Sequence, residues 1–373
     1  MISSRKNSPQ SIGLSIISLS FRNSLNIQPN GRYSISMFSK RSLFLLSIIT
    51  LVTHLAAQDS TNFPSIGKVL RFDDSMDALI DKDAKIEVLS SGFSWGEGPV
   101  WIEDGGFLLF SDVHRNQVIK WTEGIGAEIF LEPSGFTGIG NYSTGLGSNG
   151  LAVDAAGRLI SCEHGDRRIS AMTFNEGKRT LTDNYNGKRF NSPNDLAISR
   201  KGRIYFTDPI YGLPLKWEDP TRELDYAGVF LLDTDGSVSL LTKELKYPNG
   251  VELSPDEKTL YVAQSDPDNP IVMSYPIKKD GTTGKGKVLF DAKPHSHLGE
   301  GNPDGLKVDQ QGNLWITGMG GIMVVSPKGK LLGHIATGER TANCAWGNDG
   351  SILYITADTY LCRIQTLVKG RGF

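Results

Sequence analysis

Six oxygen-bearing side chains open six similar stretches of this sequence, and together they have the chemistry of a metal site. They are Glu97, Asn149, Asn194, Asn249, Asp304 and Asn343. Carboxylate and amide oxygens, without Cys or His in the series, are the ligands that hard divalent cations prefer. Two carboxylates also balance the charge of one such ion. We therefore expect one divalent ion, Ca²⁺ before Zn²⁺, Mg²⁺ or Mn²⁺. Its predicted ligands are Glu97, Asn194, Asn249 and Asp304.

The segment FSWGEGPVW (93–101) places one acid, Glu97, among apolar residues and glycines. A carboxylate buried there must be paired, ligated or protonated, because an unpaired buried charge is costly. The alternative is that these polar residues only form turns before strands, which is common for a single Asn. Turn formation accounts poorly for a Glu between two glycines. It also leaves unexplained why the acids stand in register with the amides.

The six side chains belong to a repeated unit. Each copy has two short runs rich in apolar, β-branched and aromatic residues around a turn, as in LAISRKGRIYFT, and reads as a β-hairpin. The copies are residues 96–112, 148–164, 193–209, 248–265, 303–318 and 342–358. Further apolar runs between them bring each unit to about four strands, which is typical of a β-propeller blade.

The sequence therefore predicts an all-β fold over residues 65–373: a six-bladed β-propeller with four-stranded blades around a central channel. The last strand is expected to close the ring by pairing with a segment near residues 66–90. In a propeller the innermost strands run beside the channel, so equivalent positions of successive blades meet around the axis. This arrangement would bring the six oxygen-bearing side chains together.

Residues 1–57 differ from the rest and are predicted to be an N-terminal extension with a signal peptide. From Met37, basic residues precede an apolar run (43–52) and then small residues at 56–57, as in a secretory leader. We expect Met37 to be the true start and the protein to be secreted or periplasmic. The alternatives are a Ser-rich organelle transit peptide and an uncleaved tail. The apolar run is too short to form a stable membrane span.

Charge excludes some partners. The first 58 residues hold six of the 39 Lys and Arg and none of the 41 acids, which leaves 33 basic against 41 acidic residues. An acidic body without a basic run argues against nucleic acid and anionic membrane surfaces. No obligate protein partner is evident. The three cysteines allow two readings: Cys344 and Cys362 pair on neighbouring strands, or all are buried free thiols.

The motifs GEGPVW, RFNSPNDLAISRKGRIYFTDPIYG, YPNGVELSPDEKTLYVAQSD and NPDGLKVDQQGNLWIT give the chain a family resemblance. It resembles the gluconolactonase/senescence marker protein family of six-bladed propellers, and CEHGDRRIS (162–170) looks like its gluconolactonase branch. The resemblance implies one divalent ion at the four ligands above and hydrolysis of a sugar lactone to the aldonic acid, with Asp304 as general base. Some relatives hold a second calcium through an acid that is Lys307 here, so no second ion is expected.

The expected partner is a small lactone, and its predicted contacts are Asn149, His164 and Asn194. For His164, which follows the run LISCE, two readings stay open: contact with the substrate or proton relay, and a structural imidazole. Two loops, residues 132–148 and 209–226, are expected to shape specificity. Two other functions remain alternatives at this point: a non-catalytic propeller that binds calcium or a ligand, and a hydrolase of phosphotriesters or other esters.

Overall fold

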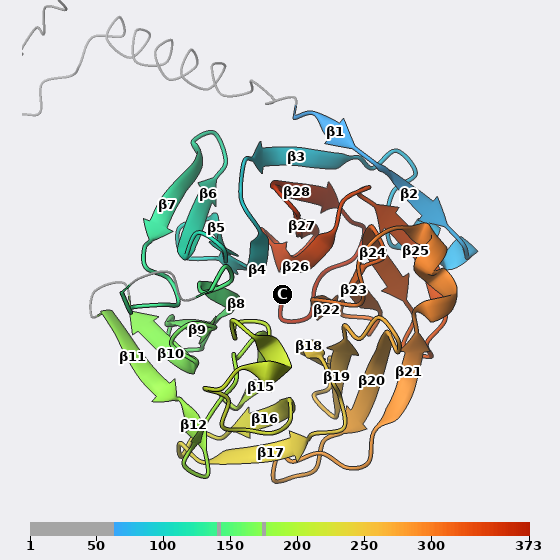
Figure 1. Ribbon diagram of the computed structural model, residues 1–373. Helices are drawn as coiled ribbons and strands as arrows, with labels where there is room; N and C mark the ends of the chain where they lie inside the picture. Colours follow the sequence, from blue (N-terminus) through green and yellow to red (C-terminus); the bar gives the residue numbers. More distant parts are fainter. Residues whose placement is uncertain (1–62, 140–142, 174–176) are drawn as a thin grey trace, which may run out of the picture. The chain divides into compact units, whose positions relative to one another are not determined.

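Six antiparallel sheets surround a central axis in the described part of the chain, which comprises residues 63–139, 143–173 and 177–373 (Figure 1). The predicted all-β, six-bladed propeller is confirmed. A compact unit spans Thr61–Phe373. The predicted leader, residues 1–57, lies outside the described residues. Within the described ranges, no helix is long and apolar enough to cross a membrane.

The first three blades follow one another along the chain. Blade one contains β4 (Gly96–Ile102), β5 (Phe107–Asp112), β6 (Gln117–Thr122) and β7 (Gly126–Leu131). Blade two contains β8 (Ser148–Val153), β9 (Leu159–Glu163), β10 (Arg168–Thr173) and β11 (Gly177–Thr182). Blade three contains β14 (Leu196–Ile198), β15 (Ile204–Asp208), β16 (Gly228–Leu232) and β17 (Val238–Thr242). A small hairpin of β12 (Asn184–Tyr185) and β13 (Lys188–Arg189) precedes blade three.

The last three blades complete the ring. Blade four contains β18 (Pro248–Leu253), β19 (Thr259–Gln264), β20 (Ile271–Pro276) and β21 (Lys287–Asp291). Blade five contains β22 (Leu306–Val308), β23 (Leu314–Gly318), β24 (Gly321–Val325) and β25 (Leu331–Ala336). Blade six contains β26 (Thr341–Gly347), β27 (Ile352–Ala357) and β28 (Tyr360–Gln365). Three short 3₁₀ helices are described: η1 (Asp74–Ala78), η2 (Lys216–Glu218) and η3 (Lys293–Leu298).

Strands from before the first blade close the ring, as the sequence predicts. β3 (Ile86–Ser91) pairs antiparallel with β28, with Ser91 opposite Tyr360. β1 (Ser65–Ile66) adds to β3, and β2 (Lys68–Arg71) pairs with β25. The two ends of the propeller are therefore joined by backbone hydrogen bonds, which leaves blade six with a full set of strands.

The hairpin turns and the core follow from the repeat. Gly202 has φ +81° in the turn between β14 and β15, a conformation that the RKG sequence supplies at little cost. Apolar side chains of neighbouring blades pack against one another, for example Leu231 of blade three with Val262 and Tyr275 of blade four. Burial between blades leaves the polar residues that open the inner strands free to face the channel.

The cysteines are free thiols. Cys162, Cys344 and Cys362 are all buried and unpaired. Cys344 on β26 and Cys362 on β28 both stand opposite Ile355, because β27 lies between their strands. Of the two interpretations of the sequence, the buried free thiols are confirmed.

The C-terminal residues lie across one end of the channel, and Arg371 fixes them there. Its guanidinium donates to Glu252 Oε1 at 2.9 Å and Glu257 Oε1 at 2.7 Å, and its backbone N donates to Val308 O. All three charged side chains are largely buried. Figure 1 shows the C-terminus near the axis of the ring, consistent with these contacts.

Replacing Arg371 by Ala should lower the free energy of unfolding by about 2–3 kcal/mol, because Glu252 is left buried without its cation. Urea denaturation measures the change. Arg340→Ala is the control, since Arg340 and Glu300 form an exposed pair that contributes less than about 1 kcal/mol. Equal losses in the two variants would contradict a structural role for the C-terminal contact.

Candidate functional site

The predicted site residues line one cavity of about 370 Å³ at the mouth of the channel. Each metal-ligand candidate stands at or just before the start of an inner strand, in blades one, three, four and five. The six predicted residues in its wall are Glu97, Asn149, His164, Asn194, Asn249 and Asp304. Asn343, the sixth member of the repeat, lies beside Glu97 and donates to its Oε2 at 3.3 Å. Their convergence is what the propeller geometry predicts; their roles stay predictions.

Glycines that follow several of these residues explain how the inner strands come so close. The backbone N of Gly250 donates to Asp304 O at 3.0 Å, and a β-carbon at position 250 would lie 2.3 Å from that oxygen. A β-carbon at Gly98 would lie 2.0 Å from Asn149 O. Only glycine permits these approaches between neighbouring blades. The dipeptides Glu-Gly, Asn-Gly and Asp-Gly of the repeat thus place the side chains around the axis.

Several acceptor oxygens in the cavity have no partner among the described residues. Asn149 Oδ1, Asn194 Oδ1 and Asp304 Oδ1 are buried and make no hydrogen bond there. From the described residues Glu97 accepts only long bonds: from Trp95 Nε1 at 3.4 Å and Gly98 N at 3.2 Å, besides the bond from Asn343. Buried acceptors without donors are costly. A cation among them would satisfy several at once, so the residues fit the predicted ion.

The charges of the cavity lead to the same conclusion. Burial, and then the charge of Asp195, raise the pKa of Glu97 to about 7. Burial also raises the pKa of Asp304 well above its usual range, and Glu97 and Asp195 raise it further. Two buried acids that repel each other are held ionised when a cation binds between them. Within the described residues, no cluster of three or more His, Cys, Asp or Glu is placed to bind a metal. The candidate set instead combines two carboxylates with two amides.

His164 orients one of these amides. Its Nδ1 lies 3.1 Å from Gly145 O and its Nε2 lies 3.4 Å from Asn194 Nδ2. Burial lowers the pKa of His164 to about 4, so the ring is neutral at pH 7. A neutral ring that donates from Nδ1 accepts at Nε2, and this fixes the Asn194 amide with Nδ2 toward the imidazole. Asn194 Oδ1 is thereby left for a ligand.

The remaining wall residues were not identified from the sequence as a site. Trp95, His114, Tyr211, Lys216, Ser265 and Asn302 also line the cavity. Ser265 Oγ accepts from Asn249 Nδ2 at 2.9 Å and donates to Pro303 O, so it orients a second amide. Tyr211 comes from the loop 209–226, which the sequence predicts to shape specificity. Nothing in the repeat signals Lys216 or Asn302, because both lie outside the hairpin units.

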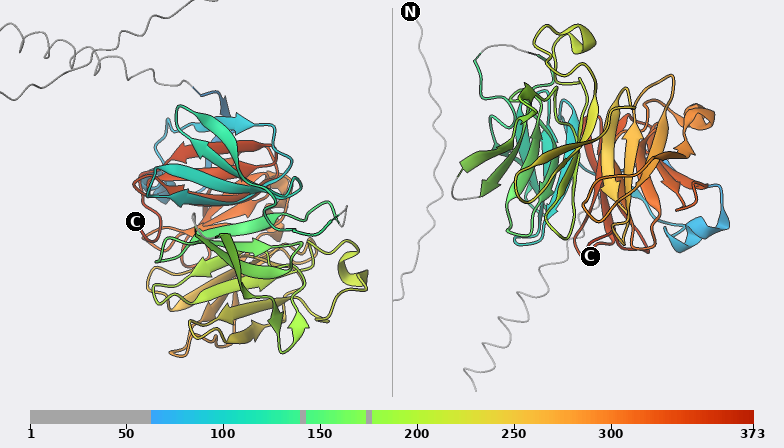
Figure 2. Two further views of the ribbon diagram at one scale, coloured as in Figure 1. Left: turned by 90° about the vertical axis from the view of Figure 1, so that its left-hand side faces the viewer. Right: turned by 90° about the horizontal axis from the view of Figure 1, so that it is seen from below.

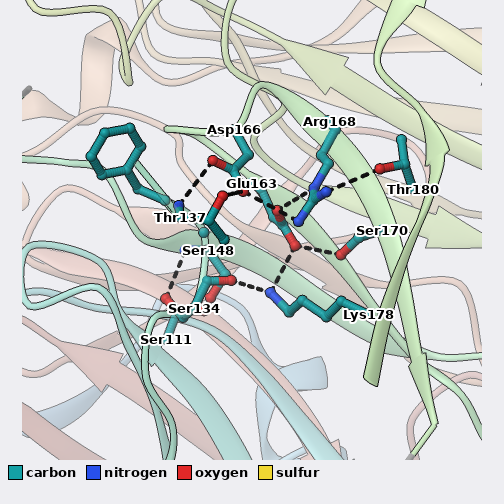
Figure 3. Close-up of polar contacts among 12 residues, drawn as sticks. Ser111, Ser134, Thr137, Ser148, Glu163, Asp166, Arg168, Ser170, Lys178 and Thr180 are labelled. Carbon is teal, nitrogen blue, oxygen red and sulfur yellow. Dashed lines mark hydrogen bonds and ion pairs between the residues drawn. The ribbon is translucent and has the colours of Figure 1, made fainter. Parts of the chain in front are cut away.

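Charged side chains brace the loop 132–148, which carries Gly145 into the cavity wall. Glu163 is fully buried and accepts from Arg168, Ser170 and Lys178, and Lys178 also donates to Ser134 O (Figure 3). This network occupies Arg168, and Arg167 donates to Phe190 O at 2.6 Å. Neither arginine lines the cavity. The basic pair of CEHGDRRIS therefore makes structural contacts outside the cavity wall.

Comparison with known proteins identifies relatives over most of the chain. Residues 95–359 match the family model described as SMP-30/Gluconolactonase/LRE-like region. A gluconolactonase from Zymomonas mobilis is 40% identical over 323 residues, covering 84% of this chain and 90% of the relative. Regucalcin from Xenopus laevis is 27% identical over 282 residues, covering 73% and 86%. The solved structure of a gluconolactonase from Xanthomonas campestris has a TM-score of 0.70 and 31% identity, covering 81% and 97%.

Proposed function

The chain belongs to the SMP-30/gluconolactonase/LRE-like family, and on that basis we propose that it hydrolyses a sugar lactone to the corresponding aldonic acid. The observation that carries the proposal is the ring of buried, underused oxygens in the cavity. Asn194 Oδ1 and Asp304 Oδ1 are buried and have no hydrogen-bond partner among the described residues, and the bonds that Glu97 accepts there are long. We propose that these three side chains, together with Asn249 in the same cavity wall, hold one divalent ion. Ca²⁺ suits an oxygen-only site of this kind, with Zn²⁺, Mg²⁺ or Mn²⁺ as substitutes.

When bound, the ion supplies Lewis-acid polarisation of the lactone carbonyl. Asp304 acts as general base: its carboxylate takes a proton from water as the water oxygen attacks the carbonyl carbon. The ring C–O bond of the tetrahedral intermediate then breaks. The proton held by Asp304 passes to the departing ring oxygen, which becomes the hydroxyl of the product. No protein nucleophile is needed.

Substrate contacts follow from the same cavity. Asn149 Oδ1 is buried without a partner among the described residues, and it accepts a hydrogen bond from a substrate hydroxyl. Asn194 Oδ1 is free for the ion or the substrate. Both ring nitrogens of His164 already have protein partners, so we assign His164 to positioning Asn194 rather than to direct substrate contact.

Turnover of D-glucono-1,5-lactone in a pH-stat, with and without EDTA, tests the proposed function. We expect acid release that EDTA suppresses and that added Ca²⁺ or another divalent ion restores. Paraoxon and p-nitrophenyl acetate serve as alternative substrates. Hydrolysis of these alone would favour a phosphotriesterase or another esterase. A metal-loaded protein that turns over none of the substrates would favour a non-catalytic binding propeller.

His164→Phe should weaken binding of Ca²⁺ about tenfold, because partners that orient a metal ligand typically contribute that much. Phe keeps the ring but removes the acceptor of Asn194 Nδ2, so the amide can rotate. Titration calorimetry of metal-free protein measures the affinity. His297→Phe is the matched control, since His297 is exposed on η3 and bonds only to Pro294 O among the described residues. An unchanged affinity in folded His164→Phe would remove the positioning role.

A further inference from the structure

We propose that the lactone substrate carries an anionic group, a carboxylate or a phosphate, and that Lys216 binds this group at the cavity mouth. The inference rests on the proposed lactone hydrolysis and adds the substrate class. It is carried by the position of Lys216, by the lack of a carboxylate partner for its ammonium group, and by the charge balance of the cavity.

Lys216 is held over the cavity by a braced loop. The segment between β15 and β16 projects from one face of the propeller, opposite the face that holds the C-terminus (Figure 2). Lys216 has φ +53°, which a residue with a β-carbon adopts only when its surroundings impose it. Leu215 N donates to Asp219 Oδ2 at 3.1 Å, and the Arg222 guanidinium lies 5.4 Å from the ring centre of Trp217.

The ammonium group of Lys216 has spare donors. It donates to Tyr211 O, and it forms no ion pair with any carboxylate of the described residues. Lys216 also lines an adjoining pocket of about 310 Å³, in which the acids are Asp266 and Asp268. Asp266 there lies 4.0 Å from Lys246 instead. Two of the three N–H groups of Lys216 are therefore available to a ligand.

The charge balance of the cavity then favours an anion. Among the residues that line the cavity, the carboxylates of Glu97 and Asp304 offset a divalent ion and His164 is neutral, which leaves Lys216 as a cation without a carboxylate partner in this wall. Lys216 is exposed at the cavity mouth, and its partial burial there lowers the pKa of its ammonium group. A neutral lactone would cover the ammonium group without pairing it, which is unfavourable. A carboxylate or phosphate would pair with it in a charge-assisted hydrogen bond.

The adjoining pocket gives such a group room, and two cations in its wall, Lys216 and Lys246, balance the carboxylates of Asp266 and Asp268. It shares Tyr211, Lys216 and Ser265 with the cavity, so a substituent at the far end of a lactone ring could pass from one to the other along this wall. Tyr211 and Tyr247 stack there with their ring centres 6.0 Å apart. Lys216 stands where the two spaces meet, as expected for the residue that selects the substituent.

The test compares three lactones on the metal-loaded protein: neutral D-glucono-1,5-lactone, D-glucaro-1,4-lactone with a carboxylate, and 6-phospho-D-glucono-1,5-lactone. We expect the protein to prefer a charged lactone. Lys216→Met should lower kcat/KM for that lactone about ten- to a hundredfold and change the neutral lactone by less than about threefold. Met keeps the length of the side chain and faces the same backbone strain, so folding is matched. Lys328→Met, an exposed change of the same charge, is the control.

Calorimetric binding of the products D-glucarate, 6-phospho-D-gluconate and D-gluconate gives a second readout that needs no turnover. If Lys216→Met binds a charged product more weakly than the wild type does, the proposal for Lys216 is supported, whether or not any lactone is hydrolysed. The absence of lactone hydrolysis would overturn only the proposed reaction. Preference for the neutral lactone, with Lys216→Met altering all three lactones by the same factor, would overturn the assignment of Lys216 while leaving lactone hydrolysis in place.

Discussion

Asp304→Asn should lower kcat for lactone hydrolysis by about a thousandfold, the size of a lost general base. Asn keeps the shape of the side chain but cannot take a proton from water, and it removes one of the two charges that face the ion. The fold should remain intact, because Asp304 Oδ1 has no hydrogen-bond partner among the described residues. Initial rates at saturating lactone and saturating divalent ion measure the effect.

The same substitution should stabilise the metal-free protein. Burial and the charges of Glu97 and Asp195 hold the pKa of Asp304 well above its usual range, so its ionised form is unfavourable without a cation. An amide in its place removes this repulsion. Asp104→Asn, in the exposed turn between β4 and β5, is the control and should change neither activity nor stability by much. An Asp304→Asn protein that keeps more than a tenth of the activity would exclude Asp304 as the base.

The second large effect concerns pH and the ion together. In the absence of metal, stability should fall as pH rises from 6.5 to about 7.5, and the contribution of Glu97 alone should lower the melting temperature by about 2 °C over this range. The folded-state pKa of Glu97 is about 7, above its unfolded value, so the folded protein keeps a proton that the unfolded chain has lost. This stabilising contribution is fully present below the unfolded pKa and disappears as pH passes the folded pKa.

Saturating Ca²⁺ should remove the part of this decline that comes from Glu97, because the ion stabilises its ionised carboxylate. Asp208 lies outside the cavity wall, and burial raises its pKa to about 7 as well, so its part of the decline should remain. The pH range for this comparison begins at 6.5 because His164 and His334 destabilise the fold at lower pH. Burial lowers the pKa of each ring to about 4, so the unfolded chain binds these protons more readily than the folded protein does. Scanning calorimetry in EDTA and in Ca²⁺ measures both curves. Glu97→Gln should make the curve in EDTA shallower, with the remaining slope due to Asp208. Parallel curves with and without the ion would show that the raised pKa values have another origin.

Much of the site could be predicted from sequence because each copy of the repeat forms one blade, so equivalent residues of the copies take equivalent positions around the axis. A residue that opens an inner strand reaches the axis in every blade, so one alignment of hairpins places Glu97 beside Asn149 and Asn249 beside Asp304. The glycines at 98 and 250 carry the same information, since the close approach of neighbouring strands excludes a β-carbon. Ring closure by residues 86–91 was equally predictable, because a closed propeller leaves no edge unpaired.

The rest could not be predicted because it depends on loops and on contacts across the channel. Tyr211 and Lys216 reach the cavity from a loop whose path no periodicity encodes. The sequence pattern of a single blade also does not show the interaction of Asp195 with Lys307, since the two residues lie in different blades. Asp195 helps keep Lys307 charged, with a raised pKa, although burial opposes this. The sequence also does not show whether Cys344 and Cys362 lie on neighbouring strands. In the structure β27 lies between their strands.

Diffraction from a crystal soaked in Mn²⁺, with an anomalous difference map, tests the central claim most directly. A divalent ion bound by one oxygen each from Glu97, Asn194, Asn249 and Asp304 should give one strong peak about 2.0–2.6 Å from all four oxygens. Protein that hydrolyses lactone under the soaking conditions but shows no peak at this position, or a peak only elsewhere, would contradict the proposed metal site.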